Sequence, residues 1–415
     1  MKSRTSGIER WVMWAMVSVG LLGSGFHIAA AGEDVSTRLD SFLQKGEIEA
    51  GLQHFAGADK NQDLFALGML QALDGLQTFS VGLNRFAYRQ DGMLGDMPFF
   101  RFGGRGTAVV EFEKVTPEKV GALFRDLRAA LRTANATLGR MDEEEFKVQV
   151  NLSQLRFDIN GDGVVAPEET LVSLLGPALG IPPTNRDGED VVVRFDLADG
   201  AWLKGYTHVM TGILEVLLTY DWSPLWTYAA PVMFQNYAPV APMAEVAMPD
   251  APMGMGSWLD AIALVHAIQL DVADPEGLRR AQAEFQGMIA CSRKSWTRIL
   301  AETDDDMEWI PSPTQTGPGG VRIRQEELDG WLAVLDELEA VLKGDALVPH
   351  VRMRPDWGIH IPSVVDHPPR LDLVMLARLS LFGAENDFFE GFECVFSLVF
   401  KVSTSDLACG ADPPH

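Results

Sequence analysis

The stretch TPEKVGALFRDLRAALRTANATL, residues 116–138, decides the fold class. Thr116 has a side chain suited to cap the first turn of a helix, and Pro117 suits the first helical position. The apolar residues that follow recur on one face of a helix with 3.6 residues per turn: Val120, Leu123, Phe124, Leu127, Leu131 and Leu138. The spacing predicts an amphipathic helix that packs one face against a core.

The same periodicity predicts four further helices, at residues 62–87, 201–220, 274–300 and 326–342. A capping box at Ser257 and Asp260 indicates one more, with Ile262 and Val265 on its apolar face. The segment 201–220 is apolar almost all round, but Lys204, His208 and Glu215 interrupt it. We therefore expect a buried core helix there and not a membrane span. Gly344 suits the end of the helix at 326–342. The sequence predicts a mainly α, irregular multi-helix protein with few short strands.

Composition divides the chain into four parts. Residues 1–31 have the basic start, the apolar run (Trp11 to Leu22) and the small residues of a secretory signal peptide. Because that run is shorter than the ~20 residues of a spanning helix, we expect cleavage near Ala31 and no stable membrane anchor. The other parts are a helical N-terminal half, a linker rich in proline and methionine, and a helical C-terminal half, at 32–222, 223–256 and 257–415. The two halves could also pack as one domain.

The charge balance limits the partners. The chain has 34 basic and 58 acidic residues and a formal net charge of −24, which disfavours nucleic acid and favours metal ions. Export would place the protein in the periplasm or outside the cell, where its three cysteines could form one disulfide at most. Cys394 and Cys409 are the nearer pair, and we expect Cys291 to be a partly buried helix residue.

One segment has the pattern of an ion site. Residues 158–169, DINGDGVVAPEE, resemble the EF-hand calcium loop at every position of its pattern D-x-[DN]-x-[DN]-G-x5-E. Such a loop supplies calcium with oxygen ligands from side chains, one backbone carbonyl and a water. The predicted ligand positions are Asp158, Asn160, Asp162, Val164, Ala166 and Glu169. The alternative is an acidic, glycine-rich turn that binds no ion.

The flanks of this loop differ from those of an EF-hand. Before the loop, Phe146, Val148, Val150 and Leu152 stand at every second position, which predicts a strand in place of the entering helix. After the loop, residues 170–175 suit a short exiting helix. Calcium sensors open an angle between paired helices, and their loops usually come in pairs. A single loop after a strand therefore favours a structural or ligand-organising calcium ion.

Beyond the loop, the chain is similar to an uncharacterised family of exported bacterial proteins. The matching stretches are FALGMLQALDGLQTFSVGLNRFAYR, RFDINGDGV, WLKGYTHVM and WTRILAETDDDMEWIPSPTQTG, which begin at residues 65, 156, 202 and 296. This resemblance runs through both halves of the chain. It implies export, and it implies no activity.

Two further segments are candidates for chemistry. The first has five carboxylates close to a predicted helix end: Glu302, Asp304, Asp305, Asp306 and Glu308. Acidic charge there opposes the helix dipole, so the segment favours a cation or arginine partner, although a solvated helix end is the more common arrangement. The second, residues 350–367, carries His350, Asp356, His360, Asp366 and His367. These are candidate acid/base groups, with a structural Arg–Asp network as the alternative.

A third candidate is copper. The thioethers of Met243, Met248, Met253 and Met255 suit Cu(I), although methionine equally fills apolar gaps. The sequence lacks H-E-x-x-H, G-x-S-x-G, S-x-x-K, the P-loop and G-x-G-x-x-G. These observations favour an exported calcium-binding protein that is not an enzyme, with an unidentified small molecule or protein as partner. The alternative is a periplasmic hydrolase-like enzyme that uses the carboxylates at 302–308 or the segment 350–367.

Overall fold

The computed structural model describes residues 34–88, 112–166, 169–171, 191–235, 237, 268–317, 320–349 and 358–372. These residues are mainly helical, as the sequence predicts, and their strands form two-stranded sheets. The chain separates into two compact units. The first unit comprises residues 1–211, 232–237 and 287–331, and the second comprises 212–231, 238–286 and 332–415. Boundaries between the units fall within four helices: α7 (Leu197–Thr219), α8 (Trp226–Met233), α10 (Gly277–Ile299) and α11 (Gln325–Lys343).

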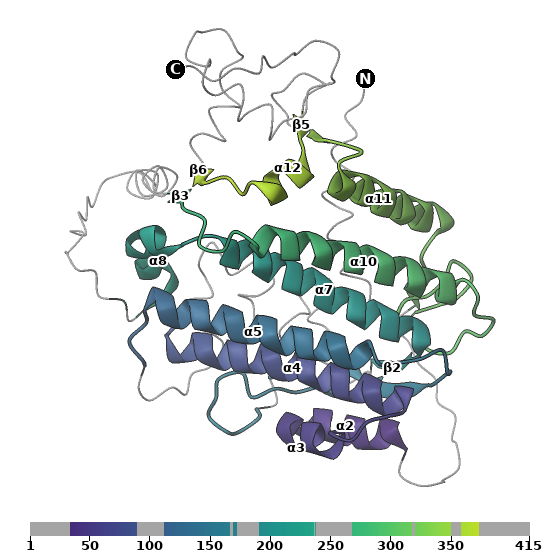
Figure 1. Ribbon diagram of the computed structural model, residues 1–415. Coiled ribbons are helices and arrows are strands. Elements are labelled where there is room, and N and C mark those ends of the chain that lie inside the picture. The colour runs from purple at the N-terminus through teal and green to yellow at the C-terminus, as the bar shows by residue number, and fades with distance from the viewer. Residues whose placement is uncertain are drawn as a thin grey trace, which may run out of the picture. The chain divides into compact units, whose positions relative to one another are not determined.

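Helices α4 (Asn61–Arg85) and α5 (Pro117–Leu138) lie side by side in the first unit (Figure 1). Both helices are predicted from the sequence and are confirmed. Thr116 caps α5, because its hydroxyl oxygen accepts a hydrogen bond of 3.3 Å from the backbone N–H of Lys119. Pro117 is the first residue of that helix, where its lack of an N–H leaves no bond unmade.

Three glycines spaced by seven residues let α4 approach α5 closely: Gly68, Gly75 and Gly82. A Cβ built at Gly75 would lie 2.6 Å from the Cβ of Ala130 on α5. That distance is shorter than a van der Waals contact, so a larger residue would push the helices apart. The glycine stripe therefore fixes how closely the two helices pack.

Helices α2 (Val35–Lys45) and α3 (Ile48–His54) form a short helical hairpin, which contributes Leu39, Leu43 and Ile48 to the core of the first unit. The turn between them begins at Gly46, whose φ of +68° suits glycine. The N–H of Gly46 donates to the carbonyl of Leu43 at 3.3 Å, which helps to end α2.

The sheet of the first unit pairs β1 (Val148–Asn151) with β2 (Val192–Phe195) in an antiparallel register from Val148 opposite Phe195 to Asn151 opposite Val192. The strand predicted before the calcium loop is thus confirmed. Val148, Val150, Val193 and Phe195 are buried, so one face of this sheet closes the core over α4.

Three more predicted helices correspond to α7, to α10 (Gly277–Ile299) and to α11 (Gln325–Lys343). The helix predicted from Ser257 lies outside the described residues. Helix α11 is followed by Gly344 with a φ of +83°, as predicted. Cys291 lies on α10, half-buried and free, as expected. None of the helices in the described part of the chain is long and apolar enough to cross a membrane.

Part of the predicted linker is helical. The 3-10 helix η4 (Ser223–Leu225) and helix α8 (Trp226–Met233) occupy the first residues of the linker, because apolar side chains such as Leu225 and Ala230 are buried there. The second unit has two small antiparallel sheets and a short helix: β3 (Gln269–Leu270) with β6 (Leu371–Asp372), β4 (Val348–Pro349) with β5 (Gly358–Ile359), and α12 (Ile361–Asp366).

Candidate functional site

The backbone of the predicted calcium loop turns around the carboxylate of Asp158. The N–H groups of Gly161 and Gly163 donate to its two oxygens, Oδ1 and Oδ2, at 2.7 and 2.9 Å. Both glycines have a positive φ, +76° and +79°, which residues with a side chain rarely adopt. The glycines of the pattern therefore fold the chain around its first predicted ligand.

Glu169 closes the loop from its other end. Its Oε1 accepts a hydrogen bond from the N–H of Ile159 at 3.2 Å, and its Oε2 accepts one from the N–H of Ala166 at 2.8 Å. The residue is only 4 % exposed. Burial raises the pKa of Glu169, and the charge of Asp158 raises it further, while the two N–H donors lower it. A cation between these carboxylates would relieve both unfavourable effects.

The middle of the loop consists of two tight turns. The side-chain oxygens of Asn160 and Asp162 accept hydrogen bonds of 2.8 Å from the N–H groups of Asp162 and Val164. The Asn160 amide also donates to Asp162 Oδ2 at 3.1 Å. Val164 is 67 % exposed, and Ala166 is half-buried. The structure thus brings all six predicted ligand positions into one closed loop, with their side-chain oxygens held by N–H groups of the same loop.

Strand β1 and the short 3-10 helix η2 (Leu152–Gln154) lead into the loop, in place of the entering α-helix of an EF-hand. The residues at the two ends of the loop pair with each other. The N–H of Phe157 donates to the carbonyl of Glu169 at 2.9 Å, and the N–H of Leu171 donates to that of Leu155 at 2.8 Å. Most of the predicted exiting helix lies outside the described residues. The pairing fixes the base of the loop.

Side chains of helix α4 form hydrogen bonds with the first residues of the loop. The N–H of Asp158 donates to Gln77 Oε1 at 3.1 Å, and the Ser80 hydroxyl donates to the carbonyl of Ile159 at 3.1 Å. The Asn84 amide donates to the same carbonyl. Gln77, Ser80 and Asn84 share one face of α4, as residues spaced by three and four positions do. These bonds fix the first residues of the loop to α4.

A second group of carboxylates lies at the start of α7. Three of its side chains each place one carboxylate oxygen within 4.8 Å of the others: Asp196, Glu302 and Glu308. Asp196 and Glu308 are buried, and Glu302 is half-buried. Asp196 caps α7 by accepting a hydrogen bond of 2.7 Å from the N–H of Ala198. We call these three residues the carboxylate cluster.

Burial and mutual repulsion raise the pKa values of Glu302 and Glu308 in the carboxylate cluster. Burial, together with the charges of Asp196 and Glu308, raises the pKa of Glu302 to about 7, although the Gln315 amide lowers it by donating at 3.0 Å. Burial also raises the pKa of Glu308 and, together with Asp196, raises the pKa of Asp199 well above its ordinary value. The carboxylate cluster is thus suited to hold protons or a cation near neutral pH.

The other acidic residues of the predicted 302–308 segment have basic partners or backbone donors. Lys147 Nζ pairs with Asp304 and with Asp306, the latter at 3.2 Å, and Arg194 also pairs with Asp306. The hydrogen bond to Lys147 lowers the pKa of Asp304. Asp305 accepts a hydrogen bond from the N–H of Thr316 at 2.8 Å. The segment therefore divides into two sets. Asp304, Asp305 and Asp306 have hydrogen-bond donors or basic partners, whereas Glu302 and Glu308 turn inward to the carboxylate cluster.

The sequence alone does not indicate Asp196 and Asp199 as site residues. Their signal is a pair of acidic residues three positions apart at the start of a helix, where they cap the first turn: the N–H of Asp196 donates to Asp199 Oδ2 at 3.1 Å. Such a pair is common at helix starts. Only the folded chain shows that Asp196 lies close to Glu302 and Glu308.

The other predicted site residues are placed only in part. His350 and Asp356 lie outside the described residues, as do Met243, Met248, Met253, Met255 and the Cys394–Cys409 pair. In the second unit, His360 Nδ1 accepts a hydrogen bond of 3.3 Å from the N–H of Ser363, and Asp366 pairs with Arg279 at 3.3 Å. The described part of this segment therefore has the contacts of a helix cap and an ion pair.

Comparisons of the chain with models of protein families, with curated proteins and with solved structures gave no match.

Proposed function

We propose that the protein is an exported calcium-binding protein in which one ion, held in the loop at 158–169, stabilises the helical scaffold of the first unit. The observation that carries this proposal is the closed loop itself, in which Asp158 and Glu169 turn their carboxylates toward N–H groups of the same loop. Calcium takes six to eight oxygen ligands, which the predicted positions supply. Export rests on the signal-peptide pattern of residues 1–31.

A structural role fits this loop better than a sensor role. A sensor couples calcium to the angle between two helices, whereas this loop follows a strand and is tied to α4 by Gln77, Ser80 and Asn84. An ion held there would bind the folded chain and not the unfolded chain. Its binding would therefore add directly to the free energy of unfolding.

Calorimetric titration of the mature chain with calcium tests the proposal. We expect one binding event, which is lost in an Asp158→Ala plus Glu169→Ala variant because both ends of the ligand set are removed. A charge-matched control, Asp59→Ala plus Asp126→Ala, changes two exposed acidic residues outside the loop and should bind as the wild type does. Absence of heat in the wild type, or equal heat in the loop variant, would overturn the assignment.

A second candidate function is hydrolytic acid/base catalysis at the carboxylate cluster. Glu302, with a pKa raised to about 7 beside Asp196 and Glu308, favours it, because an acid/base group works best with a pKa near the operating pH. A panel of chromogenic esters, phosphoesters, glycosides and peptides would detect such activity. Loss of turnover in Glu302→Gln, with Asp305→Asn unaffected, would support an enzyme; no turnover of any substrate would count against it. If calorimetry instead detects a bound calcium ion that only the Glu302→Gln variant loses, that ion belongs to the carboxylate cluster.

A further inference from the structure

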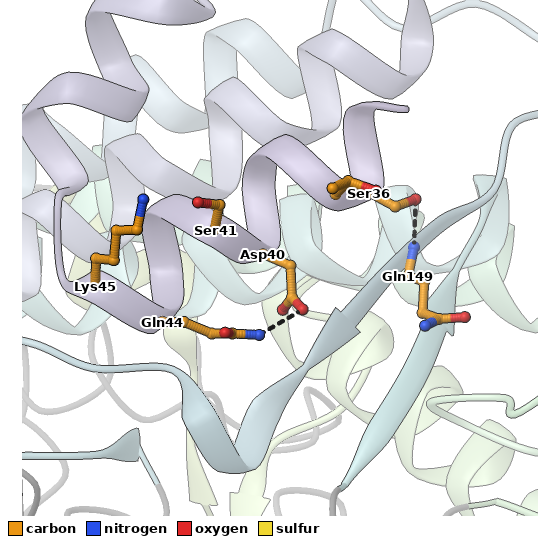
Figure 2. A pocket seen from close by; sticks show the side chains of 7 residues that line it. Ser36, Asp40, Ser41, Gln44, Lys45 and Gln149 are labelled. Carbon is orange, nitrogen blue, oxygen red and sulfur yellow. Dashed lines mark hydrogen bonds between the residues drawn. The ribbon is translucent and has the colours of Figure 1, made fainter. Parts of the chain in front are cut away.

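The hairpin of α2 and α3 is anchored to β1 at one end. The N–H of Gln149 donates to the Ser36 hydroxyl oxygen at 3.0 Å, and the N–H of Asn151 donates to Asp40 Oδ1 at 2.9 Å. Figure 2 shows the Ser36–Gln149 bond across the groove between α2 and β1. Polar residues line this groove: Ser36, Thr37, Asp40, Ser41, Gln44, Lys45 and Gln149. Side chains of α2 thus satisfy the edge of β1 that β2 leaves open.

The other end of α2 rests on the calcium loop. The N–H of Arg156, two residues before the loop begins, donates to the carbonyl of Leu43 at 3.0 Å. Val165 packs over Gly46, where an added Cβ would lie 2.6 Å from its side chain. Val165 is the loop residue between the two predicted ligand positions Val164 and Ala166. The position of the end of α2 therefore depends on how the loop is closed.

We propose that calcium controls the docking of the hairpin at residues 35–54 onto the rest of the first unit. This inference rests on the proposed calcium site. Without the ion, the carboxylates of Asp158, Asp162 and Glu169 share one loop and repel each other, which favours an open loop. Opening moves Val165 away from Gly46 and removes one of the contacts that hold the end of α2. The ion binds the closed loop more tightly than the open one, so it shifts the hairpin toward its docked state.

The docked hairpin secures the N-terminus of the mature chain. Helix α2 begins at Val35, directly after the cleavage site that we expect near Ala31. Calcium binding would therefore tie down the end that signal-peptide removal leaves free, which is where chains otherwise fray and are cut by proteases.

Amide hydrogen exchange of the mature chain, measured by mass spectrometry in calcium and in a calcium chelator, tests the inference. We expect amides of residues 38–54 to exchange at least about tenfold more slowly in calcium, whereas the middle of α5 exchanges equally in both. Equal exchange of the hairpin, in a protein whose calorimetric calcium binding is intact, would overturn the inference and leave the calcium site standing. Absence of calorimetric binding would instead remove the calcium site and the inference with it.

A pair of valine variants separates the two steps. Val165→Ala removes methyl groups from the contact with Gly46 and leaves every ligand oxygen in place, so it should bind calcium while losing most of the added protection of the hairpin. Val81→Ala removes the same groups from α4, where Val81 meets Gly161 on the other side of the loop. It should keep the protection. Equal protection in both variants would contradict the role of Val165.

Discussion

At the residue scale, the acidic side chains of the first unit differ in what compensates their charge. Asp304 and Asp306 have Lys147, and Asp306 also has Arg194. Glu302 has the Gln315 amide and lies beside two other acids, Asp196 and Glu308. Its remaining charge must be relieved by a proton or by a cation. Burial, together with the charges of these two acids, raises the pKa of Glu302 to about 7, whereas the hydrogen bond from Lys147 lowers the pKa of Asp304.

Glu302 should make the metal-free protein less stable as the pH rises. Its pKa in the folded state, about 7, lies above the ordinary value of 4.5, so the folded protein binds more protons between these two values. The free energy of unfolding should therefore fall from pH 4.5 to pH 7, by about 1 kcal/mol after allowance for solvent screening. Urea unfolding of the wild type and of Glu302→Gln at pH 5 and pH 8, in a metal chelator, measures this effect.

The variant Glu302→Gln should lose this part of the pH dependence, because an amide does not titrate. Glu143→Gln is the matched control, since hydrogen bonds to Lys294 and Arg298 lower the pKa of Glu143 to about 2, outside this pH range. The control should keep the wild-type slope. An unchanged slope in Glu302→Gln would contradict the inward placement of Glu302.

At the element scale, the approach of α4 to α5 depends on small residues. A Gly75→Ala variant places a Cβ 2.6 Å from that of Ala130, which belongs to a rigid helix. We expect a loss of about 1–3 kcal/mol in the free energy of unfolding despite the better helix propensity of alanine. Gly121→Ala on α5 is the control, because its Cβ would meet only the flexible end of Arg125. It should be neutral or stabilising by up to ~1 kcal/mol in the same thermal or urea unfolding.

The elements differ in how far the sequence predicts them. Helices α4, α5, α7, α10 and α11 are long, and the period of their apolar residues indicates each one. Helices α2 and α3 are short, so their stability comes from packing on β1 and α4, which local sequence does not show. The same holds for α8, which lies within a proline-rich segment.

The two candidate sites show the same contrast. The calcium loop is twelve consecutive residues, so a local pattern indicates all its predicted ligands. The carboxylate cluster joins Asp196, at the start of α7, to Glu302 and Glu308, which follow α10. Residues so far apart in the chain share no local pattern. The sequence could indicate Glu302 and Glu308 as acidic residues, but only the fold brings them to Asp196.

At the scale of the whole molecule, calcium should act as a stabilising ligand. The melting temperature of the mature chain should rise with calcium concentration and fall when a chelator is added, because the ion binds the folded state. At about 100 times the dissociation constant, the added stability is about 2.7 kcal/mol. Differential scanning calorimetry over a calcium series measures it. A melting temperature that is independent of calcium in the wild type would contradict a structural ion.

The most direct test of the calcium site is an experimental structure of the mature chain crystallised with calcium. We expect one ion in the loop at 158–169, with ligand oxygens at about 2.3–2.6 Å. The ligands should come from Asp158, Asn160, Asp162, the carbonyl of Val164 and both oxygens of Glu169. A closed loop that holds no ion at millimolar calcium would contradict the central claim.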